Sequence, residues 1–134
     1  MKHQFTVSTR ARAQFVDITE RVQEEVRDSG MGSGVAHVFV PHTTAGVTIN
    51  ENADPSVVAD ILATLDRLVP QDGAYDHSEG NSPAHVKASM MGFCQSVLVE
   101  DGKLVLGTWQ AIYLCEFDGP RTRRVMVKLQ PDGE

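Results

Sequence analysis

Two stretches of the chain repeat apolar residues at helical spacing, and both carry helix boundary signals. The first stretch runs through residues 18–26 and is followed by Gly30, which is placed to end a helix. The second begins after Asp54-Pro55, a cap and first-turn pair, and its apolar stripe ends before Pro70. The pattern therefore predicts two main helices, with strand-like sequence between them.

Short apolar runs rich in β-branched residues predict strands. The run VAHVFV covers residues 35–40, and GVTIN covers residues 46–50. Alternating residues within 5–16 indicate a hairpin at the edge of a sheet. Further on, three β-rich runs are joined through Asp101-Gly102 and Asp118-Gly119, both of which suit tight hairpin turns. We therefore expect an antiparallel meander in the C-terminal half.

The order of these elements favours an α+β fold over an alternating βαβ arrangement, because two helices stand among about eight strand candidates. A length of 134 residues and a mass of 14.6 kDa fit one domain that covers residues 1–134. Residues 70–84 are polar and broken by Gly and Pro, and a loop of that length in a compact domain is more often functional than idle. A short helix over residues 85–91 is expected to follow it.

Charge and cysteine content narrow the classes of partner. Eighteen Asp and Glu outnumber twelve Lys and Arg, and the net charge of −6 should repel a nucleic-acid backbone or an anionic membrane. Cys94 and Cys115 form no CxxC pair, so we expect two buried free thiols rather than a disulfide framework or a Cys-based zinc site. No stretch approaches the ~20 apolar residues of a membrane span, and no signal peptide is evident. The sequence thus predicts a cytoplasmic protein.

Three of the five histidines lie where the chain leaves regular structure. His42 follows a predicted strand, His77 lies inside the polar loop, and His85 closes that loop. Neutral imidazoles on loops held by a rigid scaffold are ordinary zinc ligands, and three of them leave a fourth position open. No HExxH motif or paired Cys accompanies them, and solvated side chains are the commoner interpretation of this spacing alone.

The run PHTTAGVTINENADP, residues 41–55, gathers donors and acceptors near one chain reversal, which suits a ligand site. Glu51 is the candidate general acid or base, because we expect the intervening strand to return the chain toward His42. The alternative for residues 50–52 is a set of turn and cap hydrogen bonds.

The C-terminal half adds an aromatic and a cationic candidate. Trp109 could line a pocket and Gln110 could hydrogen-bond a heterocycle, although a lone Trp in a strand is more often a core or interface residue. Arg121 and Arg123 alternate on one strand and could clamp a phosphate bidentately. An edge strand guarded by charge is the alternative interpretation of these arginines.

Four blocks of sequence together resemble the YjbQ-like family, small proteins often described as secondary thiamine-phosphate synthases. The resemblance runs nearly end to end. It rests on DIT with a following Val-rich helix, on HTTAGVTINENADP, on YDHSEGNSPAH, and above all on DGKLVLGTWQAIYLCEFDGPRTRRV.

The resemblance implies an α+β fold with a curved, partly closed mixed or antiparallel sheet, assembled as a homotrimer with a His-lined pocket near the subunit interface. It implies a divalent metal, zinc or magnesium, on His42, His77 and His85. The pocket neighbours that it implies are Glu51, Asn81, Trp109, Gln110 and Arg121.

The activity that the resemblance implies joins hydroxymethylpyrimidine diphosphate to a thiazole phosphate and releases diphosphate. A divalent ion and Arg121 would stabilise the diphosphate, Thr43 and Thr44 would bind phosphate, and Trp109 would face the ring. No glycine-rich phosphate loop appears, so we interpret this activity as a side activity of a metal-dependent enzyme. A metal-dependent hydrolase with Glu51 as base and a non-catalytic trimer that binds a small phosphorylated or heterocyclic ligand are the alternatives.

Overall fold

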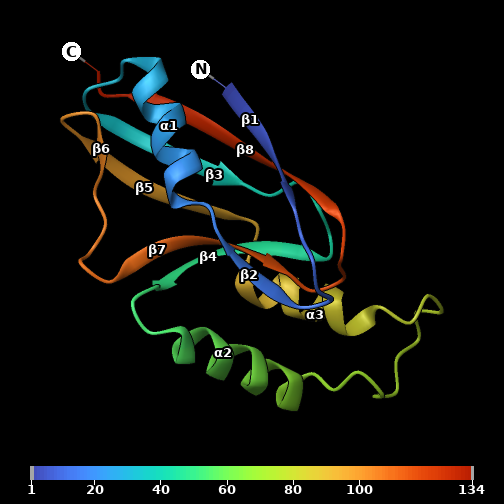
Figure 1. Cartoon of the computed structure of the whole chain (residues 1–134). Helices are drawn as coiled ribbons and strands as arrows, with labels where there is room; N and C mark the ends of the chain where they lie inside the picture. The colour runs from blue at the N-terminus through green and yellow to red at the C-terminus, as the bar shows by residue number, and fades with distance from the viewer. Residues whose placement is uncertain (1, 134) are drawn as a thin grey trace.

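The computed structural model describes residues 2–133, and in this part of the chain eight strands divide between two sheets (Figure 1). One sheet has the order β1-β8-β3-β5-β6 and the other the order β2-β7-β4, and every strand pair is antiparallel. In chain order the elements are β1 (Lys2–Ser8), β2 (Gln14–Asp17), α1 (Thr19–Ser29), β3 (Gly34–Phe39), β4 (Ala45–Glu51), α2 (Pro55–Leu68), α3 (Ser82–Met91), β5 (Cys94–Glu100), β6 (Lys103–Leu104), β7 (Gln110–Glu116) and β8 (Thr122–Pro131).

The three-stranded sheet lies between the five-stranded sheet and two of the helices. On one face of β7, Ile112 and Leu114 join a core that includes Val22 of α1. On its other face, Tyr113 packs with Ala88 of α3. In Figure 1, α1 lies across the five-stranded sheet, whereas α2 and α3 lie beyond the three-stranded one. Because both faces of β7 are covered, it is a continuous apolar run rather than an alternating one.

The two main helices form where the apolar spacing predicts them. Gly30 closes α1 in the left-handed conformation at a φ of 75°. Asp54 caps α2 and accepts a 2.9 Å hydrogen bond from the Ser56 amide. The short helix predicted over residues 85–91 is also present, but it begins three residues earlier, at Ser82.

The α+β class and antiparallel pairing are confirmed, but two predicted strand connections are wrong. The N-terminal strands do not form a hairpin, because β1 pairs with β8 and β2 pairs with β7. The C-terminal meander ends after the β5–β6 hairpin at Asp101-Gly102, and the turn at Asp118-Gly119 carries the chain from one sheet to the other. A turn signal fixes where the chain reverses, while burial of the strand faces decides which strand lies alongside.

A buried ion pair joins the two sheets at that turn. Glu116 ends β7 and Arg123 lies in β8, and their side chains are 0% and 5% exposed. Arg123 donates from Nε to Oε1 at 2.9 Å and from Nη2 to Oε2 at 2.5 Å. The Thr9 hydroxyl donates to Oε1 at 2.8 Å, and the Asp118 amide donates to Oε2 at 3.0 Å. Both carboxylate oxygens therefore accept hydrogen bonds from protein groups.

These contacts set the ionisation of Glu116. Burial alone raises its pKa, but hydrogen bonds from Arg123, Asp118 and Thr9 outweigh burial and hold the pKa below its usual 4.5. Because the folded pKa lies below the unfolded one, the stability this carboxylate contributes is complete above pH 4.5 and is lost as the pH falls through the folded pKa.

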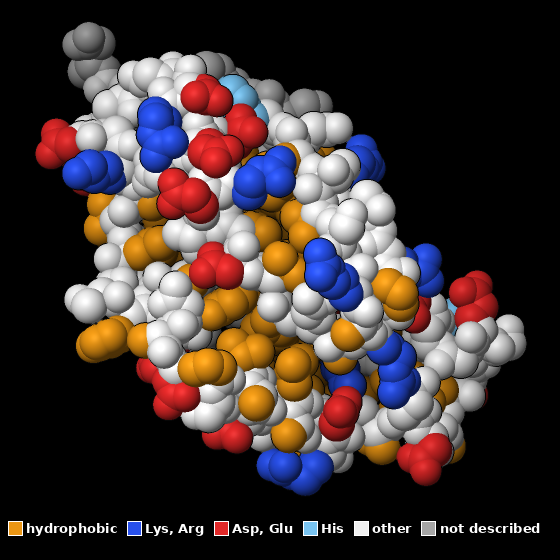
Figure 2. All heavy atoms as spheres, in the orientation of Figure 1, with side chains coloured by type: hydrophobic (Ala, Val, Ile, Leu, Met, Phe, Trp, Pro, Cys, Tyr) orange, Lys and Arg blue, Asp and Glu red, His pale blue; other side chains and the backbone are white. Residues whose placement is uncertain are grey.

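Helix α2 leaves much of its apolar stripe accessible. Leu65 is its one buried residue, and Leu68 is 65% exposed. Figure 2 shows apolar side chains gathered over the half of this face where β2 and α2 lie, while charged side chains cover the region of α1.

We predict that Arg123→Met destabilises the fold by about 3–5 kcal/mol, because it leaves the Glu116 carboxylate buried without its countercharge. Urea unfolding followed by circular dichroism measures the loss. The double replacement Glu116→Leu with Arg123→Met removes both charges and is expected to regain most of the stability. A loss below about 1 kcal/mol in the single variant would contradict the role of the pair.

Gly46 allows a test of the packing between β4 and α3, because the strand passes close to the end of the helix at this residue. A Cβ at Gly46 would lie 2.5 Å from the Gly92 carbonyl oxygen, whereas a Cβ at Gly32 meets nothing within 4 Å. We expect Gly46→Ala to cost about 1–3 kcal/mol in urea unfolding through overpacking. Gly32→Ala is the matched control, and equal effects of the two changes would refute the packing argument.

Candidate functional site

A pocket of about 470 Å³ lies beside the buried ion pair, where the two sheets and the loop before α3 meet. Eight residues singled out in the sequence line it: His42, Thr43, Thr44, His77, Asn81, His85, Arg121 and Arg123. Two acidic residues join them, Glu79 and Asp118. Side chains that are up to 81 positions apart in sequence therefore share one polar cavity.

His42 is held neutral at one wall of this pocket. It follows β3, and its Nε2 accepts a 2.9 Å hydrogen bond from the Arg124 amide. Burial lowers the pKa of His42 first, and the positive charges of Arg123 and Arg124 lower it further. Because Nε2 is an acceptor, the neutral ring carries its proton on Nδ1.

His77 and His85 line the same pocket and lie against each other. His77 belongs to the loop between α2 and α3, and His85 lies in the first half of α3. Their ring centroids are 5.4 Å apart with an interplanar angle of 89°. The Nε2 of His77 is 3.9 Å from a carboxylate oxygen of Glu79. The fold thus brings these two imidazoles together without any local sequence motif.

The three histidines have the donor chemistry of a zinc site, but they are not in ligand geometry. Among residues 2–133, no group of three or more His, Cys, Asp or Glu side chains is arranged to hold a metal ion. Coordination through Nε2 of His42 would displace the Arg124 amide, and coordination through Nδ1 would place the ring proton on Nε2, against the same amide. Metal binding by His42 would therefore require the loss of one hydrogen bond.

Asn81, Asp118 and Arg121 form a polar cluster on the same cavity. Asp118 Oδ2 accepts from Asn81 Nδ2 at 3.0 Å and from Arg121 Nη2 at 3.0 Å. Arg121 Nε also donates to the Asp118 carbonyl oxygen at 2.7 Å. The Asn81 Oδ1 is buried and has no hydrogen-bond partner within the described chain. A buried acceptor without a partner marks a position where a ligand N–H or O–H would be stabilised.

The two threonines have different surroundings. Thr44 is buried, and its hydroxyl oxygen accepts a 2.8 Å hydrogen bond from Arg123. Thr44 therefore positions Arg123 as well as lining the pocket. Thr43 is exposed at the rim and is accessible to a ligand.

Glu51 lies at the far end of β4 from the histidines, so its expected return toward His42 does not occur within this chain. In the antiparallel pairing of β4 with β7, Ala45 faces Glu116 and Glu51 faces Gln110. Six residues of extended strand span ~20 Å. The error has a simple cause, because β4 is a single uninterrupted strand that carries the chain directly away from the pocket.

Trp109 and Gln110 share that far end. Trp109 is 62% exposed, and its carbonyl oxygen accepts a 3.0 Å hydrogen bond from the Asn52 amide. Gln110 Oε1 accepts from the Gly107 amide at 2.8 Å. Neither residue lines the histidine pocket. The predicted site residues thus fall into two groups at opposite ends of the three-stranded sheet.

Sequence reasoning missed Asp118 and Glu79 and misplaced one cysteine. Asp118 was interpreted only as part of a turn, although its spacing of three residues from Arg121 is a signal for an ion pair, here 3.0 Å long. Cys94 was expected to be buried but is exposed, because it lies on the outward side of β5. Cys115 is buried as expected, and burial raises the pKa of its thiol.

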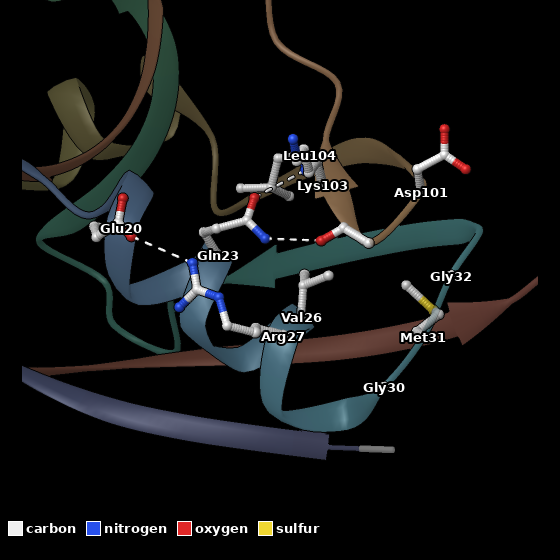
Figure 3. Close-up of a pocket in the computed structure, with 11 residues that line it drawn as sticks. Glu20, Gln23, Val26, Arg27, Gly30, Met31, Gly32, Asp101, Lys103 and Leu104 are labelled. Atoms are coloured by element: carbon white, nitrogen blue, oxygen red, sulfur yellow. Dashed lines mark hydrogen bonds and ion pairs between the residues drawn. The ribbon is translucent and has the colours of Figure 1, made fainter.

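A larger pocket, of about 680 Å³, lies between α1 and the β5–β6 turn (Figure 3). Gln23 reaches across it, donating to the Gly102 carbonyl at 2.9 Å and accepting from the Leu104 amide at 3.0 Å. Glu20 and Arg27 pair with each other at 3.6 Å. These partners already satisfy the central polar groups, and no His or Cys lines the cavity, so the histidine pocket is the stronger candidate.

No helix among residues 2–133 has the length and apolar character needed to cross a membrane.

The chain is similar to several proteins of bacteria and archaea. It is 50% identical to the UPF0047 protein YugU of Bacillus subtilis over 92% of this chain and 94% of that one. It is 47% identical to a UPF0047 protein of Methanocaldococcus jannaschii over 98% of this chain and 96% of that one. A crystal structure of a YjbQ/UPF0047 family protein from Clostridium acetobutylicum superposes with a TM-score of 0.94 at 55% identity, covering 96% of this chain and 99% of that one.

A similar fold recurs at lower identity. The structure of a YjbQ-like protein from Sulfolobus solfataricus is 34% identical, with a TM-score of 0.94 over 98% of this chain and 97% of that one. The family model described as UPF0047 protein YjbQ-like matches residues 3–132. With nearly the whole chain matched in both sequence and structure, this protein belongs to the YjbQ/UPF0047 family.

Proposed function

We propose that this protein is a metal-dependent enzyme that acts on a small phosphorylated molecule in the histidine pocket, with thiamine-phosphate formation as a side activity. The observation that carries the proposal is the meeting of His42, His77 and His85 with Arg121 in one cavity. Three imidazoles supply neutral donors for a divalent ion, and a guanidinium supplies a bidentate partner for phosphate.

The metal in this proposal is zinc, held by His77 and His85, with His42 as the third ligand once it releases the Arg124 amide. When bound, a divalent ion supplies positive charge that stabilises a departing phosphate or diphosphate. The Arg124 hydrogen bond gives His42 a competing partner, so His42 contributes less to metal affinity than the other two.

The chain's own residues bind and orient the substrate. Arg121 is 52% exposed, so a ligand can reach its guanidinium, while Asp118 fixes that group with two hydrogen bonds. The unpartnered Oδ1 of Asn81 accepts from a hydroxyl or amino group of the ligand. The buried Arg123 adds a second positive charge to the wall without leaving Glu116. Together these groups favour an anion that also carries a hydrogen-bond donor.

We predict that one variant loses the metal, whereas another keeps the metal and loses turnover. His85→Ala should lower zinc affinity at least ~100-fold and abolish turnover, since it removes a ligand. Arg121→Gln should keep stoichiometric zinc but lower turnover ~10² -fold or more, because it removes the charge that faces the phosphate. Zinc is measured by elemental analysis, and turnover by formation of thiamine phosphate and by hydrolysis of p-nitrophenyl phosphate.

Arg27→Gln is the matched control, because Arg27 is a 61% exposed arginine of α1 that lines the other pocket. It should keep both zinc and turnover. Full zinc content in His85→Ala, or full turnover in Arg121→Gln, would contradict the assigned roles. Zinc-loaded wild-type protein that turns over neither substrate would overturn the proposed activity.

The proposed assembly is a homotrimer in which each pocket is completed by the Glu51 end of a neighbouring copy. The outward side of the five-stranded sheet supports association, because it leaves Phe39 43% and Leu98 59% exposed, whereas α1 packs against the inward side. The separation of Glu51 and Trp109 from the histidines within one chain supports the sharing of a site.

A mixing experiment tests the shared site. Light scattering is expected to give three times the 14.6 kDa chain mass. Glu51→Gln alone should keep its zinc and lose ~10² to 10⁴ in rate as a general acid–base variant. Mixed trimers of Glu51→Gln and His85→Ala chains should regain part of the activity. At one kind of interface in such a trimer, the Glu51→Gln chain supplies an intact His85 and the His85→Ala chain supplies an intact Glu51. Monomers in solution, or no recovery in verified mixed trimers, would rule out the shared site.

A further inference from the structure

A second pocket adjoins the histidine pocket and shares two of its side chains. It is about 380 Å³ in volume and is lined by Tyr75, Asp76, His77, Ser82, His85 and Val86. Because His77 and His85 also line the 470 Å³ cavity, the two spaces meet at this pair of imidazoles. The pair therefore forms the common boundary of the two spaces, and a ligand bound beside it lies close to both.

The two compartments differ in chemistry. The histidine pocket contains Arg121, Arg123 and Asp118, so it suits charged and polar groups. The adjoining pocket contains no arginine or lysine, and Tyr75 and the 41% exposed side chain of Val86 give it an aromatic and an aliphatic surface. This division matches a molecule with one charged end and one flat apolar end.

Tyr75 is held in place before any ligand arrives. Its hydroxyl donates a 2.5 Å hydrogen bond to the Pro70 carbonyl oxygen. Gly73 lies directly against this side chain, and a Cβ at Gly73 would lie 3.0 Å from two ring carbons and from the hydroxyl oxygen of Tyr75. The loop therefore fixes the orientation of the ring, which lowers the entropy cost of binding against it.

We propose that this adjoining pocket binds the aromatic part of a phosphate monoester whose phosphate lies beside Arg121. The inference rests on the proposed function and adds the residues that hold the ring. It assigns this role to Tyr75, His85 and Val86 rather than to Trp109, which lies at the other end of the sheet. Contact of an aryl ring with the Tyr75 and His85 rings and with the Val86 methyl groups removes apolar surface from water and adds ring–ring attraction.

The test compares two monoesters with the same charged group. Phenyl phosphate carries a ring, whereas methyl phosphate does not, and both are titrated into the 134-residue protein by isothermal calorimetry. We expect phenyl phosphate to bind about tenfold more tightly, in line with burial of one ring. Equal affinity of the two esters would overturn the aryl subsite and leave the proposed function standing. Failure of both esters to bind would overturn the inference and the proposed function together.

A pair of variants on α3 tests whether the preference for phenyl phosphate over methyl phosphate arises in this pocket. Val86→Asn and Met90→Asn replace apolar side chains that are 41% and 49% exposed, but only Val86 lines the pocket. Val86→Asn should lower the phenyl-to-methyl affinity ratio about threefold or more, and Met90→Asn should leave it unchanged. A ratio that falls equally in both variants, or in neither, would place the ring elsewhere and overturn the assignment.

Discussion

The Glu116–Arg123 ion pair is the interaction on which the rest of this structure depends. The chain has to pass from the three-stranded sheet to the five-stranded one between residues 116 and 123, and both side chains are buried at that crossing. An unpaired charge there would be far less stable than a solvated one, so each residue requires the other. Thr9 and the Asp118 amide complete the hydrogen bonding of the carboxylate and tie the end of β1 to the same point.

The same pair determines the electrostatics of the pocket. Arg123 donates a hydrogen bond from Nη2 to the Thr44 hydroxyl, and its positive charge helps to lower the pKa of His42. It therefore acts on two residues of the segment that follows β3. The Asp118 amide that donates to Glu116 belongs to the residue whose carboxylate fixes Asn81 and Arg121. Polar groups on three separate loops are thus positioned by one buried network, which gives these loop residues a defined arrangement.

Local signals in the sequence were enough to predict the helices and the class of fold. Asp54-Pro55 and Gly30 act within one turn of the backbone, so their effect does not depend on the rest of the chain. Strand partners could not be predicted in the same way, since β1 and β8 meet only because a face of each is buried in a common core. Glu51 was misplaced for the same reason, because its position follows from the register of β4 against β7.

The hydrogen bond from the Arg124 amide to His42 makes metal binding by this histidine less favourable than binding by His77 or His85, a difference that the sequence alone does not reveal. A ring that is buried beside two arginines is easier to keep neutral than to protonate, and neutrality is what a metal ligand needs. Yet the nitrogen that is ready to coordinate is the one already occupied by the backbone. Within residues 2–133, neither His77 nor His85 has a ring nitrogen that accepts from a backbone amide. Metal binding at this pocket would therefore couple to a small movement at the end of β3, and that movement would reach β8 through the backbone of Arg124.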